Sequence, residues 1–82
     1  MAELRLSQLE TLRVAANLAD GYFTGLPFEA ADLASLFVPR LRTATARVRL
    51  ERLADEGYLT ADRSTPHRVF YTLTPKGREA LK

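Results

Sequence analysis

Arginines gather in one short stretch of this chain, RLRTATARVRLERLADEG, which runs from residue 40 to residue 57. Arginine offers its N–H donors in a fixed planar fork, which matches the geometry of phosphate groups and of guanine edges. The acids of the stretch, Glu51, Asp55 and Glu56, follow most of the arginines, and a helix macrodipole favours the opposite order. Basic residues near the N-terminus of a helix are disfavoured by its macrodipole, which indicates that they bind a partner. An anion is the obvious partner.

The same stretch predicts an α-helix from Thr43 to Glu56. An apolar stripe recurs at helical spacing and falls within about 100° of arc: Ala46, Leu50, Leu53 and Ala54. Thr43 is a suitable N-cap because its hydroxyl can accept from a backbone N–H of the first turn. Gly57 is a suitable left-handed residue just past the helix. Both ends of the helix are therefore marked.

The side of this helix opposite the stripe combines small residues with arginines. Its members are Ala44, Thr45 and Val48 at the centre and Arg47, Arg49 and Arg52 on the flanks. Small side chains would let the helix approach the floor of a DNA groove, where the flanking guanidinium groups can reach guanine edges or phosphates. Arg40 and Arg42 lie where the chain enters the helix and suit phosphate contacts.

A less specific interpretation treats these arginines as part of a solvated face. Arg47 with Glu51, and Arg52 with Glu56, have the i,i+4 spacing of surface ion pairs, each worth roughly 0.2–0.5 kcal/mol. Arg52 fits this structural role as well as it fits DNA. For Arg47 we favour a DNA contact, and for Thr43 we favour the cap over base contact.

The first helix is expected to begin with a capping box of Ser7 and Glu10 and to run to about Asp20, with Gly21 as its exit. One apolar face contains Leu9, Leu12, Ala16 and Ala19, and a second, nearly opposite face contains Val14 and Leu18. A helix that is apolar on two sides is either central to the fold, which we favour, or packs against a second copy. Val14 and Leu18 are therefore the candidate dimer interface.

Residues 21–27 predict a turn, in which Tyr22 and Phe23 are expected to fill the core. Residues 28–37 predict a short second helix, which Pro39 ends because the residue before a proline is pushed out of helical geometry. A helix, a tight link and a second amphipathic helix follow in the order of a helix-turn-helix unit.

After Gly57 the pattern changes to that of strands. Residues 58–62 and 68–73 alternate in polarity and are rich in β-branched and aromatic side chains, which predicts a hairpin. Its polar tip offers donors to phosphates, although without the arginine-rich helix we would favour an ordinary polar turn: Arg63, Ser64, Thr65, His67 and Arg68. Thr74 before Pro75 predicts the cap of a last helix over 75–81. The expected fold is α+β and mostly α, a winged helix-turn-helix in one domain over residues 1–82.

Charge is distributed unevenly along the 82 residues. Residues 1–39 carry two basic and five acidic residues, a net charge of −3, whereas residues 40–82 carry ten basic and five acidic residues, a net charge of +5. This asymmetry indicates a polyanion as partner. The chain has no cysteine, no apolar run long enough for a membrane span, no metal-ligand spacing and no glycine-rich phosphate loop. We expect a cytoplasmic protein that is not an enzyme and needs no cofactor or metal, and no small-molecule effector is evident.

These residues resemble the PadR-like and, as second choice, the MarR-like bacterial transcription regulators. The resemblance covers roughly residues 28–82 and depends on a pattern R-L-x-x-x-G-x-L followed by Y-x-L-T-x-x-G, read here at Arg52, Leu53, Gly57, Leu59, Tyr71, Leu73, Thr74 and Gly77. It implies that the helix over 43–56 enters the major groove and that the hairpin wing over 63–68 lies on the adjacent backbone or minor groove. The groove-facing positions are then Ala44, Thr45, Arg47 and Val48, the last of which is arginine in many relatives.

The sequence therefore predicts sequence-specific binding of double-stranded DNA by a small transcription regulator. Two alternatives remain: an accessory DNA-binding factor of a phage or mobile element, and a winged-helix module that docks proteins. A domain of this size contacts a short half-site, so useful specificity favours a homodimer on a pseudo-palindrome.

Overall fold

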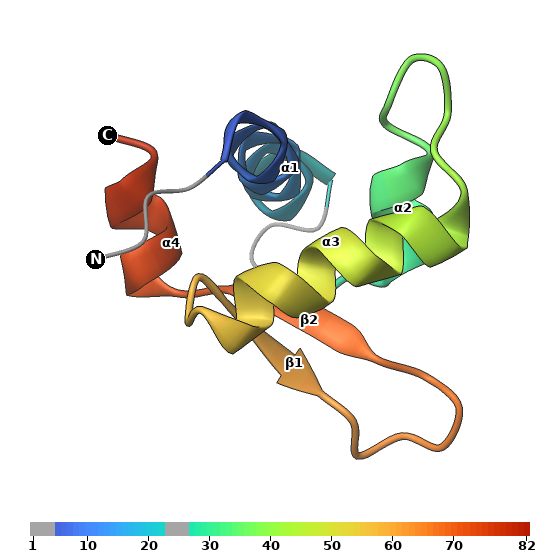
Figure 1. Cartoon of the computed structure of the whole chain (residues 1–82). Coiled ribbons are helices and arrows are strands. Elements are labelled where there is room, and N and C mark those ends of the chain that lie inside the picture. Colours follow the sequence, from blue (N-terminus) through green and yellow to red (C-terminus); the bar gives the residue numbers. More distant parts are fainter. Residues whose placement is uncertain (1–4, 23–26) are drawn as a thin grey trace.

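A computed structural model describes residues 5–22 and 27–82 of the chain (Figure 1). Its elements are α1 (Leu6–Asn17), a π-helical turn η1 (Leu18–Tyr22), α2 (Ala30–Ala34), α3 (Thr43–Asp55), β1 (Leu59–Asp62), β2 (Phe70–Leu73) and α4 (Pro75–Ala80). The predicted order of three helices, a hairpin and a last short helix is confirmed. The chain has the mostly helical α+β architecture of a winged helix-turn-helix.

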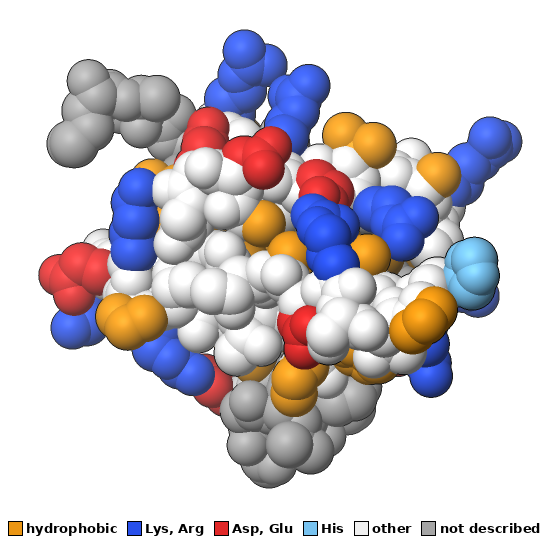
Figure 2. All heavy atoms as spheres, turned by 90° about the horizontal axis from the view of Figure 1, so that it is seen from below, with side chains coloured by type: hydrophobic (Ala, Val, Ile, Leu, Met, Phe, Trp, Pro, Cys, Tyr) orange, Lys and Arg blue, Asp and Glu red, His pale blue; other side chains and the backbone are white. Residues whose placement is uncertain are grey.

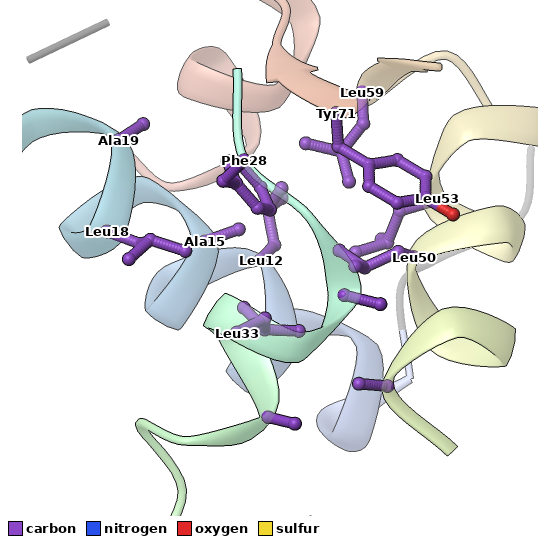
Figure 3. Close-up of a cluster of buried hydrophobic side chains, with 13 residues drawn as sticks. Leu12, Ala15, Leu18, Ala19, Phe28, Leu33, Leu50, Leu53, Leu59 and Tyr71 are labelled. Carbon is purple, nitrogen blue, oxygen red and sulfur yellow. The ribbon is translucent and has the colours of Figure 1, made fainter. Parts of the chain in front are cut away.

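One apolar core joins all of these elements except α4, whose residues contact it from the edge. Figure 3 shows side chains from α1 facing those of α2, α3 and the hairpin across this core. Its largest fully buried members come from six separate segments: Leu12, Phe28, Leu33, Leu50, Leu53, Leu59 and Tyr71. Packing against this core fixes the rotation of α3 about its own axis and thereby decides which side of that helix faces outward.

The buried side of α1 differs from the predicted one. Thr11, Leu12, Ala15, Leu18 and Ala19 are the buried residues of this segment, so the buried face is centred nearer Ala15 than the sequence indicated. Thr11 can be buried because its hydroxyl donates to the carbonyl of Ser7 at 2.8 Å. The expected second apolar face is corrected: Leu18, at 3 % exposure, belongs to the chain's own core, and Val14 is half-buried against that core.

The start of α1 also differs from the prediction. The helix begins at Leu6 with Arg5 as its N-cap residue, so Ser7 lies within the first turn and does not cap it. The Arg5 backbone N–H donates to the Gln8 side-chain oxygen at 3.0 Å, which is half of a capping box shifted two residues toward the N-terminus. The core role expected for Tyr22 and Phe23 concerns side chains outside the described residues.

The second helix is shorter than predicted: it ends at Ala34, and it starts later because Phe28 forms an isolated β-bridge. Phe28 exchanges two backbone hydrogen bonds with Tyr71 at 3.0 and 2.7 Å, and their rings lie 6.2 Å apart. Helix α2 then starts at Ala30, where the Glu29 N–H donates to the Asp32 carboxylate at 2.9 Å. This bridge attaches the start of α2 to the hairpin.

Helix α3 occupies Thr43–Asp55, close to the predicted span. Arg42 and not Thr43 is its N-cap residue, since the Arg42 carbonyl already accepts the N–H of Ala46 at 3.0 Å. The predicted cap at Thr43 is therefore wrong by one residue. The predicted end is confirmed: Gly57 has a φ of 86°, and the Tyr58 N–H donates to the Leu53 carbonyl at 2.9 Å, as in a Schellman motif.

The hairpin pairs β1 with β2 in antiparallel register, Leu59 opposite Leu73 and Asp62 opposite Phe70. The Thr74 hydroxyl caps α4 by accepting the Gly77 N–H at 3.0 Å, which confirms the predicted cap. Gly77 lies so close to the hairpin that a Cβ there would come 2.3 Å from the Tyr58 carbonyl oxygen.

Within residues 5–22 and 27–82, no helix has both the length and the apolar character needed to cross a bilayer.

Candidate nucleic-acid interface

Helix α3 exposes one side along its whole length. Ala46, Leu50 and Leu53 are fully buried, and their burial turns the opposite side toward solvent. Most residues that the sequence assigns to the DNA face are exposed there: Thr43, Ala44, Thr45, Arg47, Val48 and Arg52. Val48 retains 55 % of its surface although it is a large apolar residue. The predicted face of α3 is thus accessible, with a low apolar ridge at its centre.

Two hollows flank this ridge. The first, which we call the wing-side hollow, has a volume of about 530 Å³ and lies between α3, the start of α2 and the wing. Its lining combines Thr43, Ala44, Arg47 and Val48 of α3 with Glu29, Ala30 and Ala31, and with His67, Arg68, Val69 and Tyr71. Residues that are predicted to read bases and residues that are predicted to contact the backbone therefore share one concave surface.

The second, which we call the α1-side hollow, has a volume of about 340 Å³ and lies between α3 and the start of α1. It is lined by Thr45, Val48, Arg49 and Arg52 of α3 and by Arg5, Ser7 and Gln8. Val48 borders both hollows, which makes it the ridge between them.

Arg68, in the wing, is bound to an acid at the start of α2. Its Nε and Nη2 each donate to the Glu29 carboxylate at 2.8 Å, and its guanidinium carbon lies 5.3 Å from the centre of the Phe70 ring. The hydrogen bonds from Arg68 hold the pKa of Glu29 below its usual value. Half of the Arg68 side chain is still exposed, so this ion pair lies at the surface of the wing-side hollow.

Arg63, at the other end of the wing, forms an ion pair with Glu51 of α3. The second Glu51 oxygen accepts the Tyr71 hydroxyl at 2.5 Å. Partial burial works to raise the pKa of Glu51, but the hydrogen bonds from Arg63 and Tyr71 and the charges of Arg63 and Arg47 outweigh it and lower that pKa. Burial and the bond to Glu51 raise the pKa of Tyr71 to about 12, so the phenol remains a donor at neutral pH.

These contacts test the alternative in which arginines of α3 form surface ion pairs with acids four residues further along the helix. Glu51 forms its ion pair with Arg63, twelve residues along the chain, and Arg47 acts on it only through its charge. Among the described residues, neither Arg47 nor Arg52 is within ion-pair distance of an acid. Arg49 is half-buried, with its guanidinium carbon 5.8 Å from the centre of the Phe37 ring.

The tip of the wing is shaped by its own polar side chains. Asp62 accepts the backbone N–H and the hydroxyl of Ser64 at 2.9 and 2.6 Å, and these bonds lower the pKa of Asp62. The Arg68 N–H donates to the Thr65 carbonyl at 3.2 Å, and His67 adopts a positive φ of 63°. Ser64, Thr65 and His67 are all exposed, although the Ser64 hydroxyl already donates within the wing.

Arg40 and Arg42 are exposed in the segment that leads into α3 and line neither hollow. Figure 2 views the molecule from below: basic side chains are spread over this face, several border acidic ones, and hydrophobic side chains appear between them. On this face, positive side chains are therefore mixed with negative and apolar ones and do not form a uniform patch.

Among the interface residues that the sequence did not assign, three carry the polar contacts or the charge: Arg5, Glu29 and Tyr71. Arg5 lies in the acidic half of the chain, and Glu29 and Tyr71 act on residues 39 and 20 positions away. Helical periodicity detects partners three or four residues apart, so it carried no signal for these contacts.

No protein-family model matches this sequence, and no curated protein is similar to it. Its structure is similar to that of BpsR of Bordetella bronchiseptica, whose DNA binding is regulated by 6-hydroxynicotinic acid. The two share 24 % identity with a TM-score of 0.72, over 98 % of this chain and 51 % of that one. The organohalide-sensing transcriptional regulator RdhR-CbdbA1625, solved with 2,4-dichlorophenol bound, shares 17 % identity with a TM-score of 0.73, over 96 % of this chain and 43 % of that one.

A probable transcriptional regulator from Pseudomonas aeruginosa is 27 % identical with a TM-score of 0.53, over 93 % of this chain and 68 % of that one. The chain spans about half the length of the first two structures. It has the fold of transcriptional regulators.

Proposed function

We propose that this chain binds double-stranded DNA sequence-specifically, as the DNA-binding domain of a transcription regulator of PadR-like or MarR-like type. Helix α3 enters the major groove, and the wing over residues 63–68 lies against the adjacent backbone or minor groove. The fold shared with transcriptional regulators supports this proposal.

The observation that carries the proposal is the exposed side of α3. Ala44 and Val48 form a narrow ridge that could approach the bases, and Arg47 stands beside it without an ion-pair partner among the described residues. An arginine that reaches a guanine edge makes the commonest specific contact in the major groove. Arg47 is thus the side chain assigned to base reading.

The remaining arginines are assigned to phosphates. Arg40, Arg42 and Arg52 are exposed along or just before α3, and Arg49 lines the α1-side hollow. Phosphate contacts position a protein on the duplex and provide most of its electrostatic affinity. Ser64, Thr65 and His67 extend this contact to the wing tip, with Arg63 and Arg68 at its base.

The test is a titration of labelled random duplex, followed by selection of bound sequences from a random library. The wild-type chain should shift random duplex at low salt and enrich a short motif. If about five arginines meet phosphates, log K should fall against log salt with a slope of roughly −4 to −5. A duplex that is not shifted at low salt would contradict DNA binding and favour a module that docks proteins.

Two copies on a pseudo-palindrome remain the prediction for how specificity is reached, because one domain covers only a short half-site. Since Leu18 is buried in the chain's own core, the pair of Val14 and Leu18 offers little surface for such a dimer. Sedimentation of the free chain and of its complex with the selected duplex would measure the stoichiometry.

A further inference from the structure

We propose that the α1-side hollow holds the sugar–phosphate backbone of one strand of the bound duplex, and that Arg5 is a phosphate contact. The proposal rests on the proposed function, because it needs α3 in a major groove. It extends the DNA-binding surface to the start of α1, which lies in the acidic half of the sequence.

The position of the hollow supports this occupant. Val48 is the ridge that separates the two hollows, so a duplex whose major groove receives α3 presents one backbone on each side of that ridge. The major groove is about 12 Å wide, which is the scale of an α-helix with its side chains. The wing occupies one side of α3, and the start of α1 occupies the other.

The chemistry of the lining supports an anion. Three arginines border the α1-side hollow, Arg5 from the start of α1 and Arg49 and Arg52 from α3. Ser7, Gln8 and Thr45 add polar groups, and none of the described residues that line the hollow is acidic. Phosphate oxygens accept hydrogen bonds from guanidinium, hydroxyl and amide groups, all of which are present here.

The hollow is also continuous with the surface assigned to DNA. Thr45, Val48 and Arg52 belong to the exposed side of α3 and line the hollow as well. A duplex in contact with that side would therefore cover the hollow. A free phosphate ion bound in the hollow would instead remain exposed to water on one face. This favours a backbone phosphate over a small anion as the occupant.

The experiment compares Arg5→Gln with Arg13→Gln in the 82-residue chain. Arg13 is exposed on the same helix and lines neither hollow, so it is a matched control for the loss of one charge. Affinity for the selected duplex is measured between 50 and 300 mM salt. Arg5→Gln should reduce the magnitude of the salt slope by about 0.9 and weaken binding about tenfold at 50 mM salt. Arg13→Gln should leave both quantities near wild type, and Arg5→Lys should restore the slope.

Hydroxyl-radical footprinting adds the location of the contact. Wild type should protect backbone positions on both sides of the major groove, and Arg5→Gln should lose protection on one side only. If wild type binds duplex and Arg47→Ala weakens it while Arg5→Gln matches wild type, the inference is overturned and the proposed function stands. If wild type binds no duplex, the proposed function itself fails.

A last experiment distinguishes a DNA backbone from a small anion as the occupant of the α1-side hollow. Inorganic phosphate is titrated into the free chain at constant ionic strength, with the Arg5 and Arg49 side-chain resonances observed by NMR. Weak or absent shifts agree with a site that needs the duplex. Saturation at low millimolar phosphate together with a wild-type footprint for Arg5→Gln would reassign the hollow to a small anion and overturn the proposal.

Discussion

The two hollows that flank Val48 differ in how their arginines are engaged. On the wing side, Arg68 is held by Glu29, and Arg63, next to that hollow, is held by Glu51, which leaves Arg47 as the arginine of that lining without an ion pair among the described residues. On the α1 side, Arg5, Arg49 and Arg52 line a hollow without an acid among its described lining residues. The number of arginines in a segment is therefore a poor measure of the charge that it can offer to a phosphate.

The physical reason is that an ion-paired arginine must share or give up its carboxylate when it meets DNA. Exposed ion pairs contribute only about 0–1 kcal/mol, so replacing the carboxylate by a phosphate as the partner of the arginine costs little free energy. The carboxylate nevertheless stays beside the phosphate and repels it. We therefore expect the wing to position DNA more than to attract it, and the α1 side to supply more of the electrostatic affinity.

The largest effect is expected from removing charge on the α1 side. The double substitution Arg49→Gln with Arg52→Gln should weaken binding on the order of 100-fold at 50 mM salt and reduce the magnitude of the salt slope by roughly 2. The matching double substitution Arg63→Gln with Arg68→Gln should reduce both by less, because those charges are already partly neutralised. Anisotropy titrations over a range of salt measure both variants, with circular dichroism to verify folding. Equal losses in the two variants would remove the distinction between the hollows.

The next effect concerns base reading at the ridge. Arg47→Ala should cost about 1–3 kcal/mol on the preferred duplex and flatten the sequence preference, because a bidentate contact to guanine would be lost. Binding of the variant to the selected duplex and to random duplex is compared by competition. A uniform loss on both duplexes would show that Arg47 contacts phosphate only.

The sequence correctly predicted features of the fold that are determined by residues close to one another along the chain. The apolar stripe of α3, the left-handed Gly57 and the Thr74 cap depend on neighbours within four or five residues, and all three are confirmed. The caps predicted at Ser7 and Thr43 were displaced by one or two residues: the helices begin after Arg5 and Arg42, neither of which caps with a side-chain hydrogen bond.

Features that depend on distant contacts could not be predicted. Burial of Thr11 and Leu18 follows from where α1 meets the core, which a helical wheel alone does not determine. The bond between Arg68 and Glu29 joins residues 39 positions apart, and the bridge between Phe28 and Tyr71 lies next to it in both segments. Arg5 joins the arginines of α3 for a similar reason, because the fold brings the start of α1 beside that helix.

A smaller effect is expected from releasing a wing arginine. Glu51→Gln removes a negative charge next to the wing-side hollow and frees Arg63, so DNA affinity should rise severalfold and the salt slope should become steeper by up to about 1. Arg63 is the exposed partner of this ion pair, and the glutamine oxygen can still accept the Tyr71 hydroxyl, so the free energy of unfolding should fall by less than about 1 kcal/mol. Glu79→Gln, whose acid pairs with Lys82 beyond α4, is the control. Weaker DNA binding by Glu51→Gln would instead show that Glu51 acts by positioning the wing.

The smallest effect is the pH dependence of the ion pair between Glu29 and Arg68. The hydrogen bonds from Arg68 lower the pKa of Glu29 in the folded state, so the folded chain binds this proton less readily than the unfolded chain does. The stabilisation is therefore fully present above the unfolded pKa of about 4.3 and is lost as the pH falls through the lower folded value. Thermal unfolding of wild type and Glu29→Gln should differ by a constant amount from pH 7 to about pH 5, and the two should converge below about pH 4. A difference that persists at low pH would mean that the Glu29 side chain stabilises the chain by something other than its charge, and that the ion pair with Arg68 contributes little to holding the wing against α2.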